Sequence, residues 1–180
     1  MINTGRTVLA LAVTLALAAC GSGGGGGGGG TPTATSSSGK AVDGYISNAT
    51  VLCDANGNGL ADSGEGVVLT DGQGNFTFTP ACASTLVVSG GVNIDTNLPF
   101  KGLIKAPAGS TMVTPLTNLI VAGLSPALLT SALGVNVDVR TIDPMTNPEL
   151  LKRTVAIQQI VQQTANTIGA LGQNTTADAI

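Results

Sequence analysis

The sequence predicts an α+β fold, in which a small antiparallel β-sandwich-like module precedes a helical region of two short helices and one long helix. Two observations predict this order. Between residues 41 and 79, β-branched residues and alternating apolar residues are separated by Gly and Asn, a pattern typical of strands joined by tight turns. After residue 113, apolar residues recur every three or four positions, and Ser, Thr or Asn followed by Pro marks each expected helix start.

Residues 1–19 form a predicted signal peptide. Arg6 supplies a positive charge, and an apolar run of small residues extends from Val8 to Ala19. This run is too short to span a bilayer as a helix, because each residue adds about 1.5 Å, so a cleaved export signal is the interpretation. Its end, Leu17-Ala18-Ala19-Cys20, resembles the bacterial lipobox, which implies cleavage before Cys20 and attachment of lipid, including palmitate, to that cysteine. An ordinary secretory signal with a chance cysteine is the alternative.

Residues 20–40 are predicted to form a disordered tether between the lipid and the folded part. The glycine run from Gly23 to Gly30 is followed by Thr, Ser, Pro and Ala, which bury little apolar surface. An aspartate directly after the lipidated cysteine would retain a lipoprotein at the inner membrane, but this chain has Gly21 at that position. The segment therefore resembles lipoproteins that are released to the outer membrane. We therefore expect an outer-membrane lipoprotein that is held by Cys20 and faces the periplasm or the cell surface.

The composition of this 180-residue chain argues against several functions. Seven basic residues against ten acidic ones give a net charge of −3, so nucleic-acid binding is not expected. The chain has no His, which removes Ser-His-Asp and Cys-His nucleophilic sites and histidine-ligated zinc. Ser-Lys pairs and paired carboxylates have no recognisable local signature. We therefore do not expect an enzyme.

The predicted β module covers residues 41–113. Short β-branched runs at 41–47 and 49–53 precede its most distinctive loop, and further runs follow at 66–70 and 75–79. In the last of these, Phe76 and Phe78 alternate with threonines, so the two rings are expected on one face of a strand. The loop between residues 53 and 66 therefore connects strands.

That loop, Asp54 to Glu65, matches every position of the twelve-residue calcium-binding pattern D-x-[DN]-x-[DN]-G-x5-E. A hard cation takes about six to eight oxygen ligands, and the glycine at the sixth position permits the sharp turn that brings them together. The loop is EF-hand-like in pattern, although strands rather than helices flank it. A flexible hairpin tip built from two Asn-Gly pairs is the alternative. The expected calcium ligands are Asp54, Asn56, Asn58, the backbone carbonyl of Leu60, Asp62 directly or through water, and both carboxylate oxygens of Glu65.

Two cysteines remain if Cys20 carries lipid. An even pair in an oxidising compartment favours a disulfide between Cys53 and Cys82, which would enclose the whole calcium loop. Two buried free thiols are the alternative.

The β module also resembles known modules of bacterial surface proteins. The shared pattern comprises Gly44-Tyr45-Ile46, Ala49-Thr50-Val51, the loop from Asp54 to Glu65, and the run from Thr70 to Phe76. It is similar to the carboxypeptidase regulatory-like family and to the calcium-bearing B-type repeats of Gram-positive adhesins. The resemblance implies a surface location and a small β-sandwich. It covers about a fifth of the chain, which has one copy and no internal repeat.

The helical region is predicted over residues 114–180. Thr114 caps a helix that starts at Pro115 and runs to about Ala122, and Ser125-Pro126 opens a second helix that ends at Gly134. Asn147-Pro148 starts the longest helix. Its apolar seam packs against the rest of the chain or, alternatively, serves self-association through residues 148–171. The seam residues are Leu150, Thr154, Ile157, Val161, Thr164, Ile168 and Leu171.

These features together predict a calcium-stabilised surface or periplasmic lipoprotein with a structural, adhesive or protein-binding role. One alternative is a subunit of a larger surface assembly joined through the C-terminal helix, and another is an accessory domain of an exported enzyme. Asn174-Thr175-Thr176 resembles the cap of a further helix, as expected in a longer protein.

Overall fold

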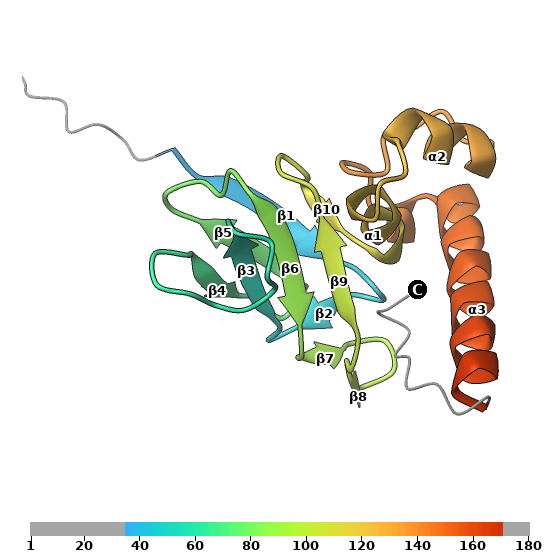
Figure 1. The fold of residues 1–180 in the computed structure, drawn as a ribbon, viewed down its shortest axis with the longest axis horizontal. Helices are drawn as coiled ribbons and strands as arrows, with labels where there is room; N and C mark the ends of the chain where they lie inside the picture. Colours follow the sequence, from blue (N-terminus) through green and yellow to red (C-terminus); the bar gives the residue numbers. More distant parts are fainter. Residues whose placement is uncertain (1–34, 171–180) are drawn as a thin grey trace, which may run out of the picture. The chain divides into compact units, whose positions relative to one another are not determined.

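The computed structural model describes residues 35–170, so Cys20, the signal peptide and the Asn174 cap lie outside the described residues. The fold is α+β, with strands first and helices last, as predicted (Figure 1). The elements are β1 (Ser37–Ala41), β2 (Ile46–Ser47), β3 (Thr50–Asp54), β4 (Val67–Leu69), β5 (Asn75–Phe78), β6 (Thr85–Ser89), β7 (Val92–Asn93), β8 (Leu98–Pro99), β9 (Leu103–Ala106), β10 (Met112–Val113), α1 (Pro115–Val121), α2 (Pro126–Leu133), the 3-10 helix η1 (Pro144–Thr146) and α3 (Pro148–Ala170).

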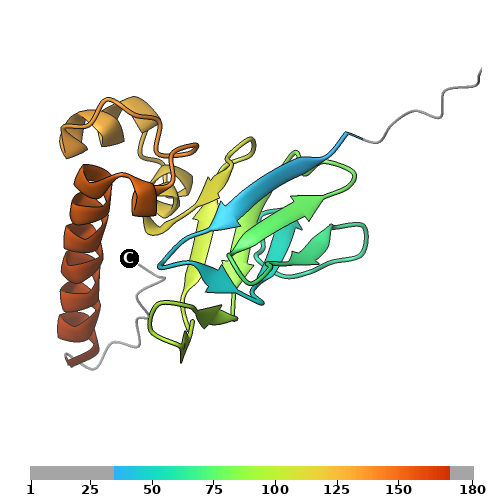
Figure 2. The same cartoon turned by 180° about the vertical axis from the view of Figure 1, so that it is seen from behind.

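The β module consists of two main sheets and one small sheet. One main sheet has the order β4-β3-β6-β9 and is antiparallel throughout. The other has the order β10-β1-β5, in which β1 pairs parallel to β10 and antiparallel to β5. The small sheet, β2-β7-β8, is antiparallel. Figure 2 shows the same arrangement from behind, with β1 and β5 in front.

The two main sheets enclose one hydrophobic core, because each contributes alternate residues to it. Phe76 and Phe78 both point inward from β5, as the alternation predicts, and their rings meet edge to face with centroids 5.9 Å apart. The buried residues of this core are Ala41, Ile46, Ala49, Val51, Phe76, Phe78, Leu86, Val88, Ile104, Ala106 and Val113.

The predicted boundary between tether and β module, after residue 40, is wrong by a few residues. Strand β1 begins at Ser37 and lies in the middle of its sheet, where its backbone pairs with strands on both sides. The segment has almost no apolar side chains, so its order comes from main-chain hydrogen bonds. Gly39 permits close packing, since a Cβ there would lie 2.8 Å from the carbonyl oxygen of Thr111.

The helix starts follow the predicted caps. Thr114 and Thr117 form a reciprocal capping box at the start of α1, and the Ser125 hydroxyl accepts from the Leu128 N–H at the start of α2. Gly134 ends α2 in the left-handed conformation, as predicted. No helix within residues 35–170 is both long and apolar enough to cross a membrane.

The helices share a second, smaller core. Leu150 and Thr154 of α3 are buried and Ile157 is half-buried, so the first half of the predicted seam packs within the chain. Thr164, further along the seam, is exposed. The buried residues of this core are Leu116, Leu129, Leu133, Val139 and Leu150.

Side chains of α1 attach the helical region to the edge of β9. The Asn118 amide accepts the backbone N–H of Lys105 and donates to the carbonyl of Leu103 at 3.2 Å. The Thr117 hydroxyl donates to the Lys105 carbonyl at 2.6 Å. These side chains satisfy backbone groups that a sheet edge would otherwise leave to solvent.

Candidate metal site

The candidate calcium loop starts at the last residue of β3 and ends two residues before β4. Asp54 is only 3% exposed, although its neighbours in the loop are exposed. Its carboxylate accepts the backbone N–H groups of Gly57, at 2.7 Å, and Gly59, at 2.9 Å. Both glycines have positive φ, which turns the chain sharply around this carboxylate. Asp54 therefore organises the first half of the loop.

Three side chains meet in the middle of the loop. The amides of Asn56 and Asn58 both donate to one carboxylate oxygen of Asp62, at 2.8 and 2.6 Å. These two hydrogen bonds hold the pKa of Asp62 below its ordinary value, because they favour the ionised carboxylate. The carbonyl oxygens of the same amides accept the backbone N–H groups of Asn58 and Leu60, at 2.9 and 2.7 Å. The third, fifth and ninth loop positions are thus side by side.

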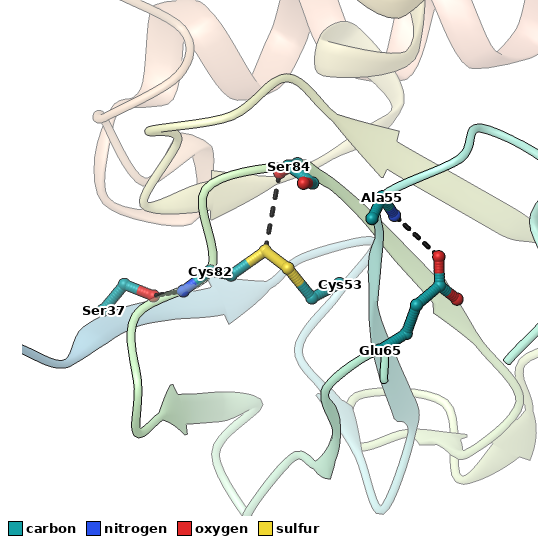
Figure 3. Close-up of a disulfide and its surroundings, with 6 residues drawn as sticks. All are labelled: Ser37, Cys53, Ala55, Glu65, Cys82 and Ser84. Carbon is teal, nitrogen blue, oxygen red and sulfur yellow. Dashed lines mark hydrogen bonds between the residues drawn. A yellow bond between two sulfur atoms is a disulfide. The ribbon is translucent and has the colours of Figure 1, made fainter. Parts of the chain in front are cut away.

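Glu65 closes the loop. One of its carboxylate oxygens accepts the backbone N–H of Ala55 at 2.8 Å, and the other accepts that of Asp62 at 3.1 Å. Figure 3 shows the Glu65 side chain reaching across to Ala55, next to the start of the loop. Both oxygens of the twelfth position are therefore directed at the loop backbone.

The structure brings the predicted ligands into one closed loop, with different degrees of convergence. The side chains of Asn56 and Asn58 form hydrogen bonds with that of Asp62. The carboxylates of Asp54 and Glu65 instead accept hydrogen bonds from backbone N–H groups. Within residues 35–170, no three acidic, histidine or cysteine side chains gather closely enough to hold a metal ion on their own. The predicted set also draws on amide and backbone oxygens, and an all-oxygen set suits a hard cation such as calcium.

A disulfide joins Cys53 to Cys82, as predicted, with Cα atoms 5.7 Å apart (Figure 3). Cys53 is adjacent to Asp54, and its backbone N–H donates to the carbonyl of Gly66 at 2.8 Å. On the other side, the Cys82 N–H donates to the Ser37 hydroxyl at 2.9 Å. The bridge therefore ties the base of the loop to the start of β1.

Lys105 is a residue near the loop that the sequence pattern did not single out. A Cβ placed on Gly59 would lie 3.8 Å from the Lys105 ammonium nitrogen, so the charged end of this side chain lies against the loop backbone. The residue is far from the loop in sequence and belongs to no motif. Its approach depends on the pairing of β3, β6 and β9.

A second polar cluster lies where the β module meets the helical region. Tyr45 donates to the Asp143 carboxylate at 3.0 Å, and the Lys40 ammonium lies 3.8 Å from the same carboxylate and 4.3 Å from the Tyr45 ring centroid. Asp43, which is close to Tyr45 in sequence, accepts a hydrogen bond from Gln158 of α3. Burial raises the pKa of Asp43, and the bond from Gln158 partly opposes this. These contacts join the β module to the helical region.

Comparisons with protein-family models, with curated proteins and with solved structures found no match to this chain. The resemblance to bacterial surface modules therefore stays a prediction.

Proposed function

We propose that this chain is a calcium-stabilised lipoprotein that is anchored in the outer membrane through Cys20 and has a structural, adhesive or protein-binding role at the cell surface or in the periplasm. The observation that carries the proposal is the closed loop from Asp54 to Glu65. It presents six oxygen-bearing positions at the spacing that calcium loops require. It is also fixed at its base by β3, by the hydrogen bond from Ala55 to Glu65 and by the disulfide.

The loop contacts support calcium over a purely structural hairpin tip. A hairpin needs only its turn residues, yet here Asp62 and Glu65, outside the Asn-Gly turns, bond back into the loop. Three carboxylates in twelve residues repel one another in the absence of a cation. Calcium would be held by Asp54, Asn56, Asn58, Leu60, Asp62 and Glu65, where it would neutralise that repulsion and cross-link the loop. The loop would thereby stiffen the β module.

Calcium should raise the melting temperature of the mature protein. Binding to the native state alone stabilises it by about 2.7 kcal/mol at a hundredfold excess of ligand over Kd. Glu65→Gln should remove most of this response, because it removes the charge of a bidentate ligand. Calorimetry in chelator and in millimolar calcium measures the effect. Glu149→Gln, at an exposed position on α3, is the matched control and should respond as wild type does.

The same wild-type measurement can reject the metal assignment. If the protein melts at one temperature in chelator and in millimolar calcium, the loop is a structural turn and not a calcium site.

The anchor has its own test. Cys20→Ser should leave an unprocessed or soluble protein and abolish detergent partitioning, because no acyl chains can then be attached at that position. Intact-mass measurement of wild-type protein should find lipid-modified Cys20 as the first residue. An unmodified N-terminus elsewhere would contradict the lipoprotein assignment and the outer-membrane location that follows from it.

Assembly through residues 148–171 remains the second proposal. Leu150 and Ile157 already pack within the chain, but Ile160 is 63% exposed and Val155 is half-exposed on the same helix. Light scattering across a concentration series tests this proposal. A mass that stays monomeric at high concentration would contradict self-association.

A further inference from the structure

Hydrogen bonds to its main-chain groups fix the position of Lys105 on β9. Its N–H donates to the Asn118 amide oxygen and its carbonyl accepts from the Thr117 hydroxyl, so α1 holds both main-chain groups of this residue. Its neighbours Ile104 and Ala106 point into the core of the β module. Because side chains alternate along a strand, Lys105 must project from the opposite face of the four-stranded sheet.

The candidate calcium loop lies over that same outer face. Strand register places Lys105 opposite Val87, and Val87 opposite Leu52, so these three residues form one row across β9, β6 and β3. Asp54 is two residues beyond Leu52 on β3 and therefore shares its face. The loop that begins at Asp54 thus leaves the sheet on the side from which Lys105 projects.

The Lys105 side chain spans the remaining distance. Its ammonium nitrogen would lie 3.8 Å from a Cβ at Gly59, and the backbone N–H of Gly59 donates to the Asp54 carboxylate at 2.9 Å. The ammonium therefore lies next to the backbone that surrounds the most buried carboxylate of the loop. The ion pairs within residues 35–170 are Lys40–Asp143 and Arg140–Asp138, so the Lys105 ammonium is more than 4.0 Å from every described carboxylate and faces the loop backbone instead.

We propose that Lys105 is a built-in counter-cation of this loop, one that supports the loop without calcium and opposes calcium when it binds. The inference rests on the proposed calcium site. A positive charge held beside the loop backbone lowers the mutual repulsion of the three carboxylates, and the same charge repels an incoming divalent cation. Lys105 would thus lower calcium affinity. The loop would then be half occupied at a higher calcium concentration than the same loop without this positive charge.

Lys105→Met tests this role, because methionine keeps much of the aliphatic stem and removes the charge. We expect calcium to bind roughly three- to tenfold more tightly by isothermal titration calorimetry at low salt. The calcium-free variant should also melt earlier than calcium-free wild type. Raising the salt concentration should shrink the difference in affinity, because salt screens charges that are partly exposed to solvent, as Lys105 is.

Two matched variants complete the design. Lys152→Met removes the same charge from an exposed position on α3 and should leave calcium affinity unchanged. Lys105→Arg keeps the charge and should bind calcium about as weakly as wild type. Should Lys105→Met fail to fold, Lys105→Gln repeats the measurement with a polar side chain.

The outcomes separate the two proposals. If wild type and Lys105→Met bind calcium with equal affinity, the role of Lys105 is wrong and the calcium site stands. Weaker binding by Lys105→Met would likewise overturn the role of Lys105. If none of these proteins binds calcium, the proposed function fails, and the inference fails with it.

Discussion

The β module and the helical region are held together by different forces. Among the described residues, the core of the β module contains eleven buried apolar side chains, most of them from the two main sheets, and the disulfide adds a covalent link. The core of the helical region contains five. Seven partly buried apolar residues also pack against this smaller core. Apolar burial contributes about 25 cal/mol per Å², so the core with fewer fully buried side chains has less stabilisation of its own. The helical region must therefore depend on its contacts with the β module.

Side-chain hydrogen bonds and an ion pair make several of those contacts. Thr117 and Asn118 bind the edge of β9, and Tyr45 and Lys40 bind Asp143 beside η1. Each such hydrogen bond contributes about 0.5–1.5 kcal/mol net. The two regions should therefore respond differently to substitution. Changes at the disulfide should affect the β module and the loop, and changes at the junction should affect the helices first.

The largest expected effect is that of the disulfide. Replacing both Cys53 and Cys82 by alanine should lower the free energy of unfolding by about 3–4 kcal/mol, since the bridge closes a loop across a sequence separation of 29. Calcium affinity should fall as well, because the strand end that holds Asp54 is no longer tied to Cys82 and must be ordered on each binding event. Denaturant unfolding and calcium titration measure the two effects.

Reduced wild-type protein provides the control for the bridge. It should behave like the double variant, and Cys82→Ala in already reduced protein should change little more. Equal calcium affinity in oxidised and reduced protein would leave the bridge in place and contradict its coupling to the metal site.

The next effect concerns the junction at β9. Asn118→Ala should destabilise the helical region by about 1–2 kcal/mol, because it leaves the Lys105 N–H and the Leu103 carbonyl without the amide that binds both. Hydrogen exchange should accelerate in α1 and α2 more than in β3 and β6. Asn136→Ala, an exposed change in the same region, is the control. Uniform acceleration across the whole chain would show that the two regions unfold as one unit.

The smallest effect is a pH dependence at Asp43. Burial raises its pKa above the ordinary value of 3.8, so the folded state favours the protonated acid. Stability from this group is therefore fully present below pH 3.8 and is lost as the pH rises through the folded pKa. Asp43→Asn should stabilise the protein by roughly 0.5 kcal/mol at pH 7 and by less near pH 3.5.

Asp95→Asn removes the same charge at an exposed position and is the control for Asp43→Asn. Thermal unfolding across this pH range measures both variants. If Asp43→Asn instead destabilises the protein at pH 7, the ionised carboxylate is a favourable partner of Gln158, and burial does not dominate at this position.

Local sequence patterns determined much of this protein. The caps at Thr114 and Ser125, the end of α2 at Gly134 and the inward alternation of Phe76 and Phe78 were all predictable. Each depends on residues within one turn or one strand. The ligand spacing of the Asp54–Glu65 loop is local in the same sense. The Cys53–Cys82 pairing followed from the prediction that Cys20 carries lipid, which leaves two cysteines to pair.

Three further features depend on the tertiary structure, because they join segments that are distant in sequence. The segment from Ser37 to Lys40 lacks the apolar pattern of a strand, and its order comes from pairing with β5 and β10. Lys105 reaches Gly59 because β6 lies between β3 and β9. Asp43 meets Gln158 because α3 returns to the β module. Backbone pairing and helix docking carry little side-chain signature, so no local pattern could have revealed these contacts.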